Sequence, residues 1–174
     1  MIQKNNTCLV LKEFLRDPLG NFQIRALSRK LSISTTAVKS AISSLEQENL
    51  IVKKDLGVYP SYSSNFESDN FRFLKKIGNV SAIRDSGLLK FLVDKYSPDF
   101  IVLFGSAAKG EDTASSDIDI FLQAKDARKS LMAYEKKLGR KIHLLCSEDF
   151  RKLKEEFKNS ILNGIKMCGY IKIY

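Results

Sequence analysis

Apolar residues recur at helical spacing through most of the first fifty positions. Three segments show the pattern: residues 7–16, 22–31 and 35–50. The first of them ends before an Asp-Pro-Leu-Gly turn. Their apolar side chains would lie on one side of each segment, with polar and charged side chains on the other. A short turn separates the last two segments, and Ser34 or Thr35 can cap the later one. The pattern predicts three helices, the last two joined tightly.

After residue 50 the spacing changes. Residues 50–54 and 58–62 predict two short strands joined by a turn that contains Gly57. Residues 68–77 return to helical spacing, and Gly78-Asn79 predicts the end of that helix. A further helix is expected over 81–96, in which Gly87 predicts a kink or a start at Ser86.

The last seventy residues alternate between strand and helix patterns. A short β-branched run and an alternating segment predict strands at 101–104 and 117–122. The segments expected to follow are a helix over 126–138 closed by Gly139, a strand over 140–146, a helix over 147–159 capped by Ser147, and one bent or two short strands over 165–174. This order predicts a mixed α/β domain of about 90 residues, and the chain as a whole is expected to be α+β.

The segment with the clearest chemistry is residues 101–122. The first strand stops at Gly105-Ser106, and after ten further residues Asp117 and Asp119 bracket an isoleucine. On a strand these two carboxylates would point the same way, about 7 Å apart at Cα. At an effective dielectric of about 20 they would repel by about 2 kcal/mol, which a cation such as Mg²⁺ would relieve. A surface strand with two aspartates beside an ordinary turn is the alternative interpretation. The Gly-Ser corner and the pair of aspartates, taken together, favour a site for a nucleotide triphosphate.

Net charge narrows the class of partner. The formal charge is +9, shared between residues 1–80 and 81–174, which favours an anionic partner without marking a basic tail. Cys8, Cys146 and Cys168 have no paired or metal-type spacing, so a zinc site is not expected and the thiols are interpreted as small buried residues. No apolar run approaches 18 residues and no signal peptide is recognised. We therefore expect a soluble, cytoplasmic protein without a membrane partner.

Gly-Ser, ten residues and Asp-x-Asp resemble the signature of the minimal nucleotidyltransferases, small members of the DNA polymerase β-like superfamily. The resemblance covers about residues 83–174. It implies an NTP substrate and two metal ions, Mg²⁺ or Mn²⁺, held by Asp117 and Asp119 as catalytic carboxylates. Nucleotide contacts would fall to the residues of the corner and its loop: Gly105, Ser106, Lys109 and Ser116.

Two residues depart from the pattern of that family. The family carries a third carboxylate on the following strand, and here His143 stands in its place as a candidate catalytic residue. A neutral imidazole adds no negative charge and is a poorer ligand for magnesium, although it can act as a base. His143 as base or manganese ligand, as a phosphate-contacting or structural residue, and as an unrelated surface residue are alternatives that stay open. Lys109 stands where the family frequently carries an arginine. It would interact with a phosphate as a point charge, without the bidentate hydrogen bonds of a guanidinium.

Residues 7–63 resemble a winged helix-turn-helix domain of the bacterial and archaeal repressor kind. The resemblance implies that the exposed face of the second helix of the motif enters a DNA major groove and that lysines of the hairpin reach phosphate. The candidate DNA-binding residues are Thr35, Thr36, Lys39, Ser40, Ser43, Lys53 and Lys54. A small helical domain used for dimerisation or protein docking is the alternative. The face offers no bidentate base contact before Gln47, so strong sequence readout is not evident.

The predicted organisation is a DNA-binding domain over 1–64, a linker helix over 65–80 and a nucleotidyltransferase-like domain over 81–174. Two functions are compatible with it. The first is metal-dependent transfer of an NMP to a protein or nucleic-acid hydroxyl, with an antitoxin role toward a small helical toxin implied by the resemblance. The second is a DNA-binding regulator that retains the transferase fold with little or no catalysis. A homodimer is expected in both cases.

Overall fold

The computed structural model describes residues 5–54, 57, 59–125 and 130–172. The chain forms two compact units, Met1–Leu74 and Lys75–Tyr174. The elements of the first unit are α1 (Asn6–Arg16), α2 (Ile24–Leu31), α3 (Thr35–Gln47), β1 (Ile51–Lys54) and β2 (Ser61–Ser64). Helix α4 (Asp69–Asp85) begins in the first unit and continues into the second.

The three helices predicted for the first fifty residues are confirmed. Ser34 accepts a hydrogen bond from the N–H of Ala37 and so caps α3. Val10 and Phe14 of α1 pack with apolar residues of α2 and α3 in one buried core, where burial of each large side chain contributes about 1.5–3 kcal/mol. The polar faces of the helices are left to solvent.

A two-stranded antiparallel ribbon follows the helices, with Ile51 opposite Ser64. The returning strand was predicted over 58–62, and this placement is wrong, since the strand begins at Ser61. Pro60 has no N–H to donate to a strand ladder, which explains the later start. Phe22 adds a bridge that the sequence did not reveal, since it exchanges both backbone hydrogen bonds with Tyr62. Of the predicted turn, residues 55 and 56 lie outside the described part of the chain.

The predicted end of a helix at Gly78-Asn79 is wrong. Helix α4 runs through both residues and ends at Asp85. Ser86 and Gly87 separate it from α5 (Leu88–Tyr96). A glycine inside a helix costs about 1 kcal/mol relative to alanine. The side chain of Asn79 offsets this cost, because it donates hydrogen bonds to the carbonyl of Ala107 and to Asp112.

The second unit is built on a mixed sheet of four strands in the order β5-β4-β3-β6. Its remaining elements are β3 (Phe100–Phe104), α6 (Gly105–Lys109), β4 (Ile118–Gln123), α7 (Met132–Leu138), β5 (Ile142–Ser147), the 3₁₀ turn η1 (Phe150–Lys152), α8 (Glu155–Leu162) and β6 (Ile165–Gly169). Strand β4 runs antiparallel to β3 and parallel to β5, so the ends of β3 and the beginnings of β4 and β5 meet at one edge.

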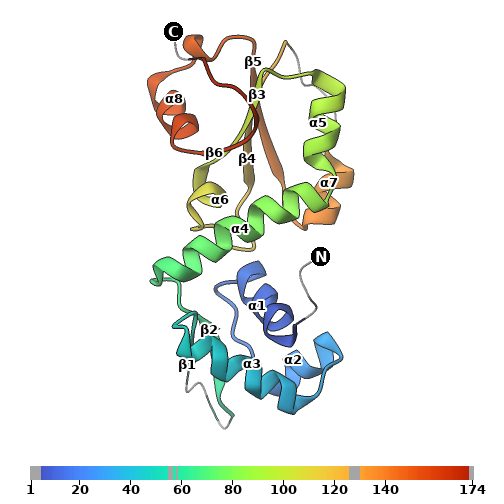
Figure 1. Ribbon diagram of the computed structural model, residues 1–174, viewed down its shortest axis with the longest axis vertical. Coiled ribbons are helices and arrows are strands. Elements are labelled where there is room, and N and C mark those ends of the chain that lie inside the picture. The colour runs from blue at the N-terminus through green and yellow to red at the C-terminus, as the bar shows by residue number, and fades with distance from the viewer. Residues whose placement is uncertain (1–4, 55–56, 58, 126–129, 173–174) are drawn as a thin grey trace. The chain divides into compact units, whose positions relative to one another are not determined.

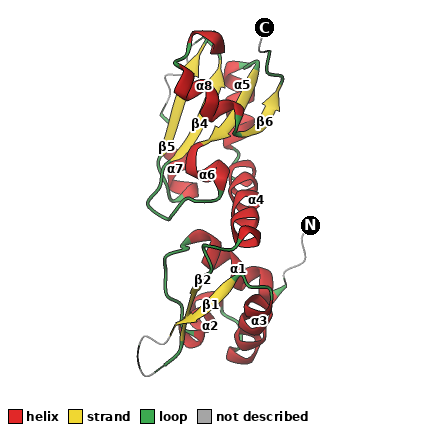
Figure 2. Cartoon of the chain, turned by 90° about the vertical axis from the view of Figure 1, so that its left-hand side faces the viewer, coloured by secondary structure: helices red, strands yellow, loops and turns green. Residues whose placement is uncertain are grey.

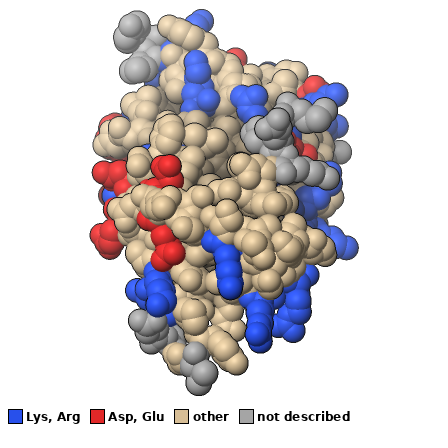
Figure 3. All heavy atoms as spheres, turned by 60° about the horizontal axis from the view of Figure 1, so that its bottom comes forward, with Lys and Arg blue, Asp and Glu red and all other residues tan. Residues whose placement is uncertain are grey.

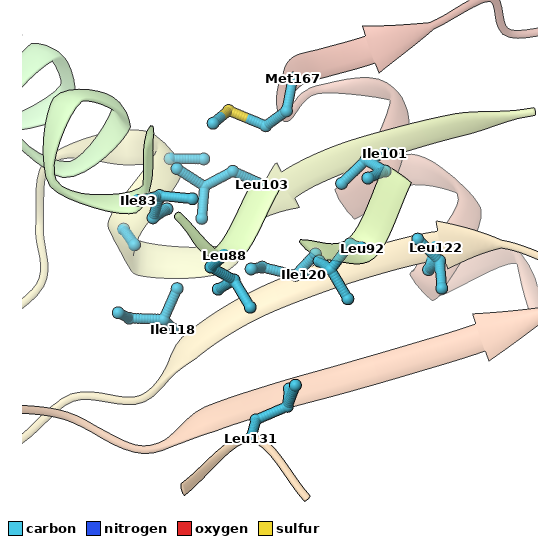
Figure 4. Packing of buried hydrophobic residues seen from close by; sticks show 12 residues of the cluster. Ile83, Leu88, Leu92, Ile101, Leu103, Ile118, Ile120, Leu122, Leu131 and Met167 are labelled. Atoms are coloured by element: carbon cyan, nitrogen blue, oxygen red, sulfur yellow. The ribbon is translucent and has the colours of Figure 1, made fainter. Parts of the chain in front are cut away.

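Helices cover both faces of this sheet (Figures 1 and 2). On one face, residues of α4, α5 and α7 pack on alternate residues of β4, as the close view of Ile83, Leu88, Leu92 and Ile120 shows (Figure 4). On the other face, α8 and η1 cover a second apolar cluster that includes Phe121. The alternation predicted for 117–122 is therefore confirmed from Ile118 onward, and Asp119 belongs to the α8 face, whereas Asp117 precedes the strand.

Of three predictions for the second unit, one is wrong and two are confirmed in part. The helix expected over 147–159 is wrong, because Ser147 ends β5, Asp149 caps η1 and α8 begins only at Glu155. The helix expected over 126–138 is described only from Met132, with residues 126–129 outside the described chain. Over the described part of 165–174 there is one strand, β6, which ends at Gly169.

The three cysteines are half-buried and form no disulfide with one another. The thiol of Cys146 donates a hydrogen bond of 3.2 Å to the carbonyl of Ala124. Among the described residues no helix has the length and apolarity that crossing a membrane requires.

Candidate functional site

A glycine corner connects β3 to α6 and forms one wall of the candidate site. Gly105 has a φ of +69°, a left-handed conformation that side-chain-bearing residues rarely adopt. A Cβ at this position would also overlap Oδ2 of Asp119. The Asp119 carboxylate therefore lies directly against the Gly105 backbone, and the space that only glycine leaves is the space that this carboxylate fills.

Asp119 is also paired with His143 across the sheet. The two residues are partners in the parallel ladder between β4 and β5, and both lie on the α8 face. Nδ1 of His143 is 3.0 Å from Oδ1 of Asp119. The His143 side chain is 57 % exposed and that of Asp119 26 %, so both carry surface that is open to solvent. The structure thus brings together three of the predicted site residues, from three different strand ends.

Asp117 lies in the loop immediately before β4, and its side chain is exposed. Its backbone carbonyl accepts a hydrogen bond of 3.0 Å from Nη2 of Arg140. The next N–H, that of Ile118, donates to the carbonyl of Lys141. The position of Asp117 is therefore fixed through its backbone, and only its own side-chain torsions remain free.

The other residues predicted to contact the nucleotide lie in two places, helix α6 and the loop that follows it. Ser106 is half-buried in the first turn of α6, and Lys109 is exposed at its end. The Ser116 hydroxyl accepts a hydrogen bond of 2.9 Å from the N–H of Thr113, and so it closes the loop before Asp117. Ser106 and Lys109 thus extend the corner that carries Gly105, whereas Ser116 shapes the loop.

A buried ion cluster beneath this loop was not predicted from the sequence. We call Lys75, Asn79, Asp112 and Arg140 the Asp112 cluster. Asp112 is fully buried and accepts hydrogen bonds from Lys75 (2.7 Å), Arg140 (2.6 Å) and Asn79 (2.8 Å). Burial lowers the pKa of Lys75 from its usual value, against the raising effect of its hydrogen bond to Asp112. These residues fix the loop that leads to Asp117.

The donor chemistry suits a divalent cation that is shared with a substrate. Among the described residues no group of three or more His, Cys, Asp or Glu side chains is gathered closely enough to hold a metal ion by itself. Magnesium commonly needs only one or two protein carboxylates, because substrate phosphates supply further oxygens. Asp119 and Asp117 fit that smaller requirement. His143 adds an imidazole, which magnesium favours less than oxygen ligands.

The first unit presents the predicted DNA-binding residues on its surface. All of them are exposed: Thr35, Thr36, Lys39, Ser40, Ser43, Lys53 and Lys54. Figure 3 turns the bottom of Figure 1 toward the viewer, and Lys and Arg side chains stand out along the lower and right-hand parts of that view. Shortly before β2, the ring centre of Tyr59 lies 5.8 Å from the guanidinium of Arg25. The surface is thus accessible and rich in cations.

One comparison with known proteins gives a result. Residues 87–170 match the family model described as Polymerase beta, Nucleotidyltransferase. Neither the comparison with curated proteins nor that with solved structures gives a match. The matched residues contain Gly105, Asp117, Asp119 and His143, and the mixed four-stranded sheet fits the fold of such a domain. The match therefore supports a nucleotidyltransferase-type domain of the polymerase β superfamily over residues 87–170.

Proposed function

We propose that the protein transfers a nucleoside monophosphate from an NTP to a hydroxyl of a protein or nucleic acid. The observation that carries this proposal is the placement of the Asp119 carboxylate between the Gly105 corner and His143. A purely structural sheet edge has no need to hold a carboxylate against a left-handed glycine. At a nucleotidyltransferase site, the same arrangement sets a metal-binding oxygen beside the backbone that receives phosphate.

In this reaction the glycine corner, the two carboxylates and His143 have separate roles. The acceptor hydroxyl oxygen forms a bond to the α-phosphorus of the NTP, the bond from that phosphorus to the β-phosphate oxygen breaks, and pyrophosphate leaves. Ser106 and Lys109 hold the triphosphate through a hydroxyl and a positive charge. Nδ1 of His143 lies 3.0 Å from Oδ1 of Asp119. Because an ionised carboxylate only accepts hydrogen bonds, Nδ1 would carry the proton of this pair, and Nε2 would take the proton of the attacking hydroxyl.

A divalent ion bound by Asp117 and Asp119 would supply charge neutralisation for the phosphate oxygens. The protein's part is to hold the two carboxylates together despite their repulsion, which would be about 2 kcal/mol at a separation of about 7 Å and an effective dielectric of about 20. The contact of Asp119 with His143 and the backbone hold on Asp117 both serve this purpose.

The test is transfer of label from α-labelled ATP, CTP, GTP and UTP in the presence of Mg²⁺ or Mn²⁺. We expect the wild-type protein to transfer label and the double variant Asp117→Asn/Asp119→Asn to transfer none, because the neutral amides cannot replace the carboxylates as metal ligands. In the same assay His143→Ala is expected to lower the rate by about 100-fold, the lower end of the range for loss of a general base. Equal label transfer by wild type and double variant would overturn the catalytic assignment.

A second candidate function has its own observation. His143 occupies the ladder position opposite Asp119, where the resemblance places a third carboxylate, so the site has one anion fewer than the family pattern. A nucleotide-binding fold with little catalysis, joined to a DNA-binding unit, would fit that loss. NTP binding by wild type without transfer under either metal would favour this regulator over the enzyme.

We further propose that the first unit is a winged helix-turn-helix that binds DNA for targeting or autoregulation. The order of three helices and an antiparallel ribbon supports this, as does the exposed polar face of α3. In this proposal α3 lies in a major groove, while Lys53 and Lys54 contact phosphate. By the resemblance described above, a small helical toxin is the proposed protein acceptor. We also propose that the chain acts as a homodimer in the cytoplasm.

Removing two lysines of this surface is expected to weaken DNA binding in a salt-dependent way. In Lys39→Ala/Lys53→Ala the slope of log affinity against log salt should become shallower by about 2, because each phosphate contact releases about 0.9 counterion. This slope is measured by following the binding of duplex DNA by fluorescence anisotropy at salt concentrations between about 50 and 200 mM. The control Lys90→Ala/Lys95→Ala removes the same charge from exposed positions of α5 and should leave the slope unchanged. An unchanged slope in the first variant would show that α3 and the ribbon do not contact DNA.

A further inference from the structure

The loop between α6 and β4 is attached at both ends to one arginine. Nη1 of Arg140 donates to Oδ2 of Asp112 (2.6 Å), near the start of the loop. Nε donates to the carbonyl of Ser116 (2.7 Å) and Nη2 to that of Asp117 (3.0 Å), at its end. Because a guanidinium is planar and rigid, these three bonds fix the two ends of the loop relative to each other.

The rest of the Asp112 cluster holds this arginine in place. Asp112 is fully buried, and Lys75, which is 3 % exposed, bonds the same carboxylate oxygen as Arg140. Asn79 donates both to the second oxygen of Asp112 and to the carbonyl of Ala107 in α6. The cluster therefore connects α4, the glycine-corner helix α6 and the residue before β4 in one hydrogen-bonded unit.

We propose that Arg140, anchored on Asp112, is a positioning residue that sets Asp117 beside Asp119 for metal binding. This inference rests on the proposed function, in which the two aspartates share a cation with the NTP. Two carboxylates repel each other, and Asp117 lies in a loop while Asp119 is fixed in β4. Without a hold on its backbone, Asp117 would move away from Asp119 when no cation is bound. The bond from the Ile118 N–H to the carbonyl of Lys141 holds the strand side of Asp117, and the two carbonyl contacts of Arg140 hold its loop side.

A conservative variant separates positioning from simple folding. Arg140→Lys keeps the positive charge for Asp112 but lacks the fork that reaches two backbone carbonyls. The measured quantity is the affinity for Mn²⁺ alone, followed by the electron paramagnetic resonance signal of free Mn²⁺, so that turnover is not required. We expect Arg140→Lys to bind Mn²⁺ about 10-fold or more weakly, as is usual when a residue that orients metal ligands is lost.

Arg151→Lys is the matched control. Arg151 also makes two side-chain hydrogen bonds to one aspartate, Asp149, in the same unit, but it does not contact the loop. It should bind Mn²⁺ as the wild type does. If Arg140→Lys does not unfold cooperatively in urea, Arg140→Gln replaces it, because Lys75 still neutralises Asp112 and the glutamine offers only one amide group to the two carbonyls.

The outcomes separate this inference from the proposed function. Weaker Mn²⁺ binding in Arg140→Lys with an unchanged Arg151→Lys supports positioning. Wild-type affinity in a folded Arg140 variant overturns positioning alone, provided that Asp117→Asn weakens binding. Mn²⁺ affinity that Asp117→Asn does not change, or no binding by the wild type, overturns the metal assignment and with it the role of Arg140.

Discussion

Gly105→Ala is expected to abolish nucleotidyl transfer while leaving a folded protein. The added Cβ would occupy the space of Asp119 Oδ2, so the carboxylate must rotate away and lose its 3.0 Å contact with His143. Its metal-binding oxygens would then leave the corner. In the labelled-NTP assay we expect Gly105→Ala to be as inactive as Asp117→Asn/Asp119→Asn.

Gly87→Ala separates this steric effect from backbone strain. Gly87 also has a positive φ, of +82°, but a Cβ there meets no atom within 4 Å. Both substitutions should therefore cost about 1–2 kcal/mol of unfolding free energy from the left-handed backbone, measured by urea denaturation. Only Gly105→Ala should lose transfer. Full activity in Gly105→Ala would mean that the position of Asp119 beside the corner is not needed for the reaction.

The local chemistry of the candidate site could be predicted from sequence because it follows strand periodicity. A strand that stops at Gly-Ser, and an alternating segment that carries Asp119 on its strand and Asp117 just before it, place the corner and the carboxylates without any tertiary knowledge. His143 became a candidate through the family resemblance, which places a third carboxylate at this point of the strand over 140–146, and the structure pairs it with Asp119. What periodicity did not give is the contact between His143 and Asp119, which depends on the order of strands in the sheet.

The Asp112 cluster was missed because charged residues are ordinarily assigned to solvent. A signal was nevertheless present on α4. Phe71, Lys75, Asn79 and Ile83 follow one another at steps of four, so Lys75 and Asn79 fall on the stripe whose two ends are fully buried apolar residues. The break predicted at Gly78-Asn79 hid that stripe, since it divided the helix in the middle. A polar residue that continues an apolar stripe is a candidate for a buried ion pair.

The second large effect is expected at the centre of this cluster. Asp112→Asn should lower the free energy of unfolding by about 3–5 kcal/mol, because it leaves the Lys75 and Arg140 charges without a buried counter-charge. Urea denaturation at pH 7 measures the loss. For comparison, Asp69→Asn removes a carboxylate whose side chain is 94 % exposed beside Arg72 and should change stability by less than about 1 kcal/mol.

Lys75→Met shows why the loss belongs to unpaired charge. Alone it should be nearly neutral, since Arg140 still pairs with Asp112 and burial already disfavours the ammonium. Because burial lowers the pKa of Lys75, the unfolded chain binds more protons between that lowered pKa and the ordinary value of 10.5. Wild-type stability should therefore gain relative to Lys75→Met as pH rises through that window. When Lys75→Met is added to Asp112→Asn, part of the lost free energy of unfolding should be restored, because one of the two buried cations without a counter-charge is removed. A double variant no more stable than Asp112→Asn would instead attribute the lost stability to the hydrogen bonds of Asp112.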